Sequence, residues 1–194
     1  KHKLAEQVIR TFAIESAVYR VSKSIDCAIE ELVADGMPKD RAGIEGIAQY
    51  AIEAAILKVY GSEVLDFVVD EGVQIFGGMG YSAETEVEQS YRDSRINRIF
   101  EGTNEINRMV VSDLTIKKAL RSGFDVVNYA NNLMEKGLEP EEKPAESLFH
   151  ELQNQVKAFK NTSLFLLGLI TQKYKKELVS KQELLFNISD IIIN

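Results

Sequence analysis

Apolar residues recur every three or four positions along most of the chain, which is the spacing of an amphipathic helix. The first such segment covers residues 3–34, and the stretch "ADGMPKDR" (residues 34–41) ends it with a glycine and a proline. A second segment covers residues 43–76 and ends at "GGMG", where glycines stop a helix. Each of these two segments is predicted to be one long helix.

The rest of the chain repeats the pattern in shorter segments, and no stretch alternates apolar and polar residues as a strand does. Further helices are predicted over residues 85–97, 104–120, 125–135 and 148–170, and from residue 181 onward. The segment "KGLEPEEKP" (residues 136–144) is predicted to be a linker of turn residues and acids. We therefore predict an all-α fold: an antiparallel helical bundle over residues 1–120 and a helical appendage over residues 121–194.

Composition narrows the class of protein further. The net charge is -7 and the basic residues are interspersed with acids, so no nucleic-acid-binding surface is expected. The single cysteine cannot form an internal disulfide, which favours a reducing compartment. With one cysteine and two distant histidines, no metal site is expected. The longest apolar run, "LFLLGLI", is far shorter than the roughly 20 residues that span a bilayer.

The sequence begins and ends within segments that have a helical or apolar pattern. The chain begins without methionine on "KHKLAEQ", already in helical spacing, and it stops on the apolar run "DIIIN". We expect it to be part of a longer protein.

Three segments carry candidate chemistry. "QIFGGMGY" (residues 74–81) lacks the G-x-G-x-x-G spacing and follows a helix, which argues against a Rossmann site. It is either a helix cap with a turn or a backbone that a flat or anionic ligand can approach. "YRDSRINR" (residues 91–98) reads as an exposed, ion-paired segment that fixes a turn.

The third segment is "FEGTNEI", where a helical pattern breaks directly after Glu101. One interpretation is structural: Gly102 ends a helix and Thr103 caps the next one. The other is chemical: the break aims a carboxylate away from the helix face. The residues alone leave both interpretations open.

Together these segments carry a resemblance. The stretch "VQIFGGMGYSAETEVEQSYRDSRINRIFEGTNEINRMVV" closely resembles the carboxy-terminal helical domain of the acyl-CoA dehydrogenases. "HKLAEQVIR", "YAIEAAILKVYGSE" and "FVVDEGVQIFGG" extend the likeness over roughly residues 1–120. The tail, with "FKNTSLFLLGLITQKY", resembles the additional helical region of the very-long-chain type.

This resemblance implies a flavoprotein that binds FAD and oxidises a fatty acyl-CoA to the trans-2-enoyl-CoA. It implies that Glu101 removes the proton next to the carbonyl, that its backbone N–H binds the thioester oxygen, and that a hydride goes to FAD. A carboxylate buried beside an acyl chain has a raised pKa and is a stronger base. Phe100 and Gly102 match substrate-binding positions. The matching cofactor-binding positions are Gln74, Ile75, Phe76, Gly77, Gly78, Thr103, Asn104 and Glu105. The first five of these match the stretch that a neighbouring subunit contributes to the adenosine half of FAD.

The resemblance also implies an electron-transfer flavoprotein as acceptor and a homo-oligomer, in the bacterial cytoplasm or on the mitochondrial matrix side. The family's amino-terminal helical domain, its β domain and the first helix of the bundle are absent from this sequence. We therefore expect the chain alone to be inactive and not to retain FAD. Two alternatives stay open: an acyl-CoA oxidase with the same base, and a non-enzymatic helical oligomerisation module with a vestigial site.

Overall fold

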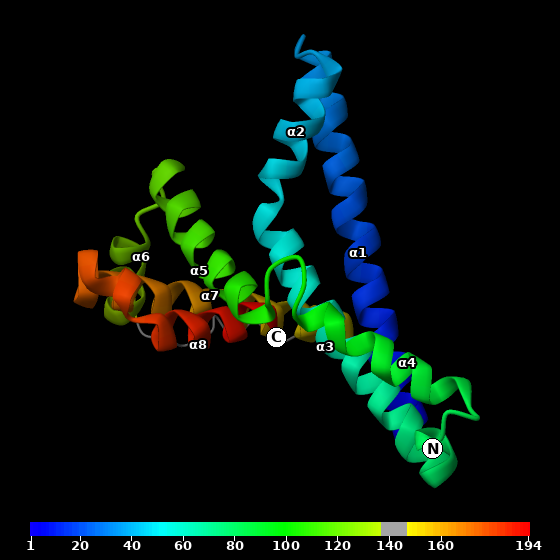
Figure 1. Ribbon diagram of the computed structural model, residues 1–194. Coiled ribbons are helices and arrows are strands. Elements are labelled where there is room, and N and C mark those ends of the chain that lie inside the picture. Colours follow the sequence, from blue (N-terminus) through cyan, green and yellow to red (C-terminus); the bar gives the residue numbers. More distant parts are fainter. Residues whose placement is uncertain (137–146) are drawn as a thin grey trace. The chain divides into compact units, whose positions relative to one another are not determined.

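The computed structural model describes residues 1–136 and 147–194 (Figure 1). All regular structure in them is helical, without strands, which confirms the predicted all-α fold. The elements are α1 (His2–Ala34), α2 (Lys39–Gln49), α3 (Ala51–Phe76), η1 (Gly77–Tyr81), α4 (Glu86–Ser94), η2 (Arg95–Arg98), α5 (Asn104–Arg121), α6 (Val126–Lys136), α7 (Leu148–Tyr174), η3 (Lys175–Ser180) and α8 (Gln182–Ile193). The predicted linker lies, after its first residue, outside the described residues.

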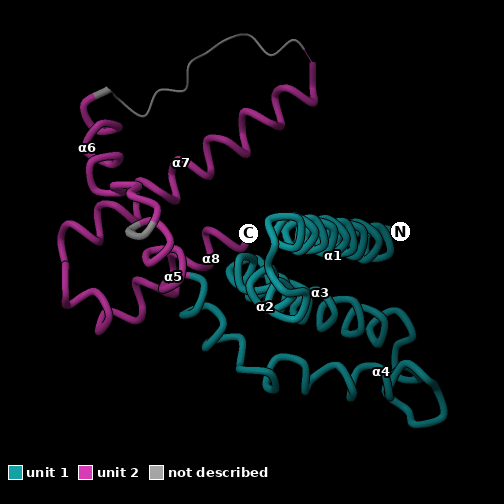
Figure 2. Tube along the Cα trace, turned by 90° about the horizontal axis from the view of Figure 1, so that it is seen from above, with its two compact units in different colours: residues 1–111 teal, residues 112–194 magenta. Residues whose placement is uncertain are grey.

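The chain forms two compact units, Lys1–Val111 and Ser112–Asn194 (Figure 2). The division falls within α5, which begins in the first unit and ends in the second. The domain boundary after residue 120 stays a prediction. All candidate site residues lie in the first unit.

In the first unit, α1 runs antiparallel to α2 and α3 (Figure 1). The contacts keep one constant register, because each step forward on α1 is matched by an equal step back on its partner. These pairs are Lys3 with Glu71, Gln7 with Val68, Ile14 with Gly61, and Ile29 with Gly46. Val59 of α3 is fully buried in this core. The antiparallel arrangement that the sequence predicted is thus present.

The prediction of a single helix over residues 43–76 is wrong. Helix α2 begins at Lys39, directly after Pro38, and it gives way to α3 at Tyr50. There the hydrogen bonding tightens: the N–H of Tyr50 donates to the carbonyl of Ile47, three residues back. No glycine or proline marks this position in the sequence. The break instead accompanies close packing of α2 on α1, where Gly46 lies against Ile29.

The predicted helix over residues 85–97 also needs correction. It is α-helical only as far as Ser94 and continues as the 3-10 helix η2, whose tighter turn leads into the loop before α5. Both α4 and η1 pack on α3. The long helix α3 is therefore the support for every candidate site segment.

In the second unit, α7 packs against α6, η3 and α8. Gly168 of α7 permits the close approach of α6, because a side chain there would clash with the carbonyl of Val126. Leu167, Leu185 and Ile188 are buried in this unit. Within residues 1–136 and 147–194, no helix combines the length and the apolarity that crossing a membrane requires.

Candidate functional site

The loop between η2 and α5 has an unusual backbone at the predicted base. Glu101 has φ 55° and Gly102 has φ 79°, so two successive residues are left-handed. Glycine adopts this conformation without steric cost, whereas for other residues it costs roughly 1–2 kcal/mol. Strain of this kind persists only where the surrounding structure holds it.

Side-chain donors hold three successive backbone carbonyl groups of this loop. The side-chain amide of Asn107 donates to the backbone oxygens of Glu101, Gly102 and Thr103 at 3.4, 2.9 and 3.1 Å. Lys58 of α3 adds a second donor, with its Nζ 2.6 Å from the Gly102 oxygen. These bonds fix the direction in which the peptide groups of the turn point.

The turn also carries two backbone N–H donors that are not used within the protein. Among the described residues, the backbone N–H groups of Glu101 and Gly102 donate to no protein acceptor. Both residues are exposed. Exposed backbone N–H groups that no protein acceptor uses can bind an oxygen that carries negative charge.

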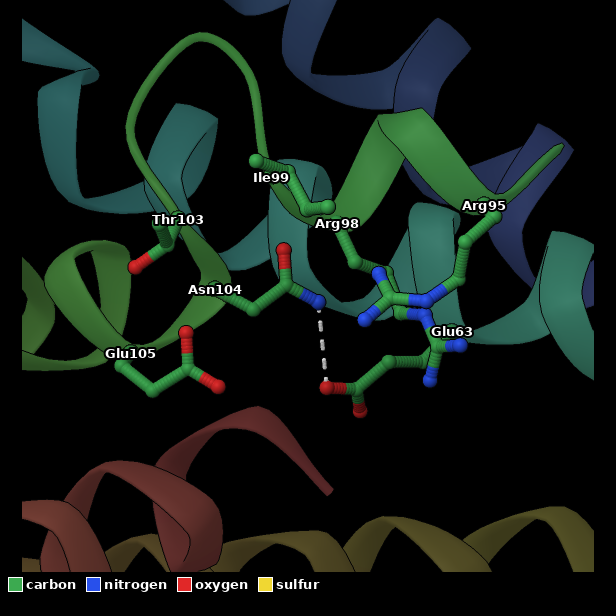
Figure 3. A pocket seen from close by; sticks show the side chains of 7 residues that line it. All are labelled: Glu63, Arg95, Arg98, Ile99, Thr103, Asn104 and Glu105. Atoms are coloured by element: carbon green, nitrogen blue, oxygen red, sulfur yellow. Dashed lines mark hydrogen bonds between the residues drawn. The ribbon is translucent and has the colours of Figure 1, made fainter. Parts of the chain in front are cut away.

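Thr103 and Asn104 anchor the start of α5. The Thr103 hydroxyl accepts a hydrogen bond from the N–H of Ile106 at 3.2 Å, which is the capping role that the structural interpretation gave it. Asn104 is only 3% exposed. Its amide nitrogen donates to Glu63 (Figure 3) and to Ser62. Its oxygen accepts from Lys58 at 2.8 Å. The side chain of Asn104 is therefore used inside the protein, and a contact to a cofactor would have to come from its backbone.

Charge is concentrated on α3 and the start of α5. Burial lowers the pKa of Lys58, and the carboxylates of Glu105, Glu101 and Glu63 oppose that shift. The pKa of Glu105 is lowered by a backbone hydrogen bond and the Thr103 hydroxyl, and further by nearby cations, so this carboxylate stays ionised. Glu63 in turn pairs with Arg108 at 2.9 Å. Acids and bases are thus interleaved beside the turn.

The pocket beside this turn is small. Its volume is about 150 Å³, and its lining combines residues of α3, η2 and the start of α5 (Figure 3). Sites for small molecules and cofactors usually measure about 300–1,000 Å³. The described residues therefore form at most one wall of a cofactor site here.

The predicted site residues fall into two groups that the structure does not bring together. Phe100 to Glu105 lie at the turn, with Phe100 48% exposed and the Glu101 side chain open to solvent. Gln74 to Gly78 lie at the end of α3 and just beyond it. At a rise of 1.5 Å per residue, this helix end is about 25 Å from Lys58, which contacts the turn. This second group is exposed, and a side chain at Gly77 or Gly78 would point into open space. Its bare backbone fits close approach by a flat ligand such as FAD.

The arginine segment has the structural role that its sequence favoured. Arg92 pairs with Glu88 one turn earlier, and Arg98 reaches Asp66 of α3 at 2.8 Å, which ties η2 to the long helix. A larger pocket of about 540 Å³ lies beside these arginines and Tyr81 and Tyr91. None of the predicted site residues lines it.

Lys58 is the residue at this site that sequence reasoning missed. It stands 43 positions before Glu101, as the lone charge in the apolar run "AAILKVYG". A single cation in such a run was the available signal, because a partly buried lysine needs acceptors for its three N–H groups.

Comparisons with a family model and with known proteins all identify acyl-CoA dehydrogenases as similar to this chain. Residues 1–114 match the model of the family described as acyl-CoA dehydrogenase, C-terminal domain. The chain is 44% identical over 196 residues to a probable acyl-CoA dehydrogenase of Bacillus subtilis, which covers all of this chain and 33% of that protein. It is 41% identical over 112 residues to the human very long-chain specific acyl-CoA dehydrogenase of mitochondria, which covers 58% of this chain and 14% of that protein.

A solved structure supports the same likeness at the level of the fold. The crystal structure of an acyl-CoA dehydrogenase complexed with FAD from Bacillus anthracis matches 98% of this chain with a TM-score of 0.90 and 43% identity. The match covers 33% of that chain. The present chain thus spans about one third of the length of its bacterial relatives.

Proposed function

Because this chain belongs to the acyl-CoA dehydrogenase family, we propose that the protein carrying it oxidises a fatty acyl-CoA to the trans-2-enoyl-CoA. FAD, when bound, supplies the acceptor for the hydride. The observation that carries the proposal is the turn at Glu101 and Gly102, where a strained backbone presents a carboxylate and two unused N–H groups together.

In this proposal, Glu101 is the general base. Its carboxylate takes the proton from the carbon next to the thioester carbonyl, and its own N–H donates to the carbonyl oxygen, where negative charge develops. Gly102 leaves room for the thioester, and the exposed ring of Phe100 packs near the substrate. The base needs apolar surroundings that the described residues do not supply, because Glu101 is exposed. We propose that the bound acyl chain and the rest of the protein supply them.

The residues proposed to hold FAD form two separate groups, one at the turn and one at the end of α3. Thr103 and the ionised Glu105 stand beside the base, where Glu105 can accept hydrogen bonds from a ligand. Gln74 to Gly78 offer exposed backbone about 25 Å away along α3. That separation fits a homo-oligomer in which one chain contributes to two cofactor sites. We further propose an electron-transfer flavoprotein as acceptor, and the bacterial cytoplasm or the mitochondrial matrix as compartment.

Anaerobic mixing with saturated acyl-CoA tests this function. The flavin-loaded protein should lose its flavin absorbance and form one trans-2-enoyl-CoA per flavin. Reoxidation by an electron-transfer flavoprotein supports the dehydrogenase, whereas rapid reoxidation by oxygen with release of hydrogen peroxide would identify an oxidase. A flavin that no acyl-CoA from short to very long reduces would contradict the proposal and favour the non-enzymatic module.

A further inference from the structure

Lys58 connects α3 to the turn that carries the predicted base. Its Nζ lies 2.6 Å from the Gly102 oxygen and 2.8 Å from the side-chain oxygen of Asn104. Asn107, which also holds the turn, lies on α5 itself, only a few residues further along the chain. Lys58 therefore joins the long helix α3 directly to a backbone carbonyl of the loop.

The surroundings of Lys58 fit a positioning group better than a surface cation. The side chain is half-buried, and Asn104, which it contacts, is almost fully buried and also bonded to Ser62 and Glu63 of α3. Burial lowers the pKa of Lys58, and the carboxylates of Glu105, Glu101 and Glu63 oppose part of that shift. A charged donor makes a stronger hydrogen bond to a carbonyl than a neutral one does.

We infer that Lys58 is a positioning residue for the reaction, which locks the Gly102 carbonyl and so orients the carboxylate and the N–H of Glu101. This inference rests on the proposed function. The bond pulls the Gly102 oxygen towards α3, and planarity then fixes the Gly102–Thr103 peptide as a whole. Because Gly102 joins that peptide to Glu101, fixing it limits the backbone angles of Gly102 and so the direction in which Glu101 faces. Together with the Asn107 amide, this bond holds the carbonyls of a turn in which Glu101 and Gly102 are both left-handed.

The inference predicts an effect on rate more than on binding. Replacing Lys58 by methionine keeps the chain length and removes both the donor and the charge. We expect the rate of flavin reduction per bound flavin to fall about ten- to a hundredfold, since a misplacement of about 1 Å at a reacting group can cost 100-fold. The acyl-CoA concentration for half-maximal rate should change little. Lys58→Arg, which keeps a cationic donor, should restore most of the rate.

The experiment is stopped-flow flavin reduction of the complete flavin-loaded protein, with wild type, Lys58→Met, Lys58→Arg, Glu101→Gln and Lys3→Met compared per bound flavin. Lys3 pairs with Glu71 of α3 outside the site and is the matched control for losing a lysine. Hydrogen exchange of the Ile106 and Asn107 amides, which donate to Thr103 at the end of the turn, gives a second readout, and it should quicken only in Lys58→Met. If Lys58→Met does not load flavin, Lys58→Gln takes its place: its side chain is shorter and uncharged, so the rate should still fall below that of wild type and of Lys58→Arg.

Two results would overturn the inference. One is a wild-type rate in Lys58→Met, and the other is a lost rate that Lys58→Arg leaves equally low. The Glu101→Gln arm separates this failure from that of the proposed function. An active Glu101→Gln would refute the base itself, whereas an inactive Glu101→Gln beside a normal Lys58→Met would refute only the role of Lys58.

Discussion

At Glu101 the backbone adopts a conformation that glutamate rarely takes, and neighbouring side chains supply the bonds that keep it there. An ordinary helix end has no need of such strain, since Gly102 alone could provide the left-handed residue. The strain therefore points to a requirement for the direction in which Glu101 and its N–H face. This is the physical reason to treat the turn as a site rather than only as a connection.

Gly102→Val tests that distinction. The new side chain would meet Asn107 and strain a residue at φ 79°, which costs roughly 1–3 kcal/mol of stability. We expect acyl-CoA binding to suffer beyond that cost, because the side chain also fills the space of the thioester. Gly36→Val is the matched control: its φ is 91°, it lies in the turn after α1, and nothing surrounds it. Thermal unfolding and acyl-CoA titration of both variants decide the matter, and equal binding per folded molecule would make Gly102 purely structural.

Residue identities predicted this turn only in part. Gly102 predicted a break in the helical pattern and Thr103 predicted a cap of the next helix, and the structure has both features. The left-handed Glu101 was not predictable, because local sequence gives glutamate no preference for positive φ. Lys58 was missed because it contacts the turn through tertiary packing. The assignments of Glu101 and of the cofactor contacts stay predictions.

On the scale of elements, α3 organises the first unit. It packs on α1, carries Lys58 and Ser62 to the turn, and holds η2 through Asp66 and Arg98. Helix ends marked by glycine or proline were predictable within a few residues. The change from α2 to α3 at Tyr50 was not, since no glycine or proline stands at that position.

The packing of α2 on α1 can be tested with two glycines one turn apart. A side chain at Gly46 would lie 2.5 Å from Cγ1 of Ile29 and 3.3 Å from its backbone nitrogen. We expect Gly46→Ala to lower the free energy of unfolding by about 1–2 kcal/mol through overpacking. Gly43→Ala has open space and should raise it by about 0.5–1 kcal/mol, because alanine suits a helix better. Chemical denaturation measures both, and a neutral Gly46→Ala would mean that the two helices separate readily.

On the scale of the whole chain, the described residues form only part of a cofactor site, and many apolar side chains are exposed. The pocket at the turn is too small for a flavin, and the second group of predicted cofactor residues lies far along α3. The exposed apolar side chains include Leu4, Val8, Phe12 and Tyr19 on α1, and Leu148, Leu152, Val156 and Phe159 on α7. Apolar surface of this extent favours association with another copy of the chain.

We therefore predict that residues 1–194 expressed alone are helical, self-associated, inactive and colourless. Absorbance at the flavin band after dialysis against excess FAD measures cofactor retention, and sedimentation at micromolar concentration measures association. Retention of one flavin per chain would contradict the conclusion that this chain forms too little of the cofactor site to hold FAD. A monomer that unfolds cooperatively would contradict the predicted association.

The central claim is that Glu101 is the base, and one substitution tests it most directly. Glu101→Gln keeps the size of the side chain and removes its basicity, while Glu30→Gln changes an exposed glutamate of α1 outside the site. The measurement is the anaerobic rate of flavin reduction by saturated acyl-CoA, per bound flavin, in the complete protein. We predict normal flavin content and a rate lowered by about three orders of magnitude in Glu101→Gln, as for the loss of a general base, with no change in Glu30→Gln. A near-normal rate in Glu101→Gln would contradict the claim and place the base at another residue.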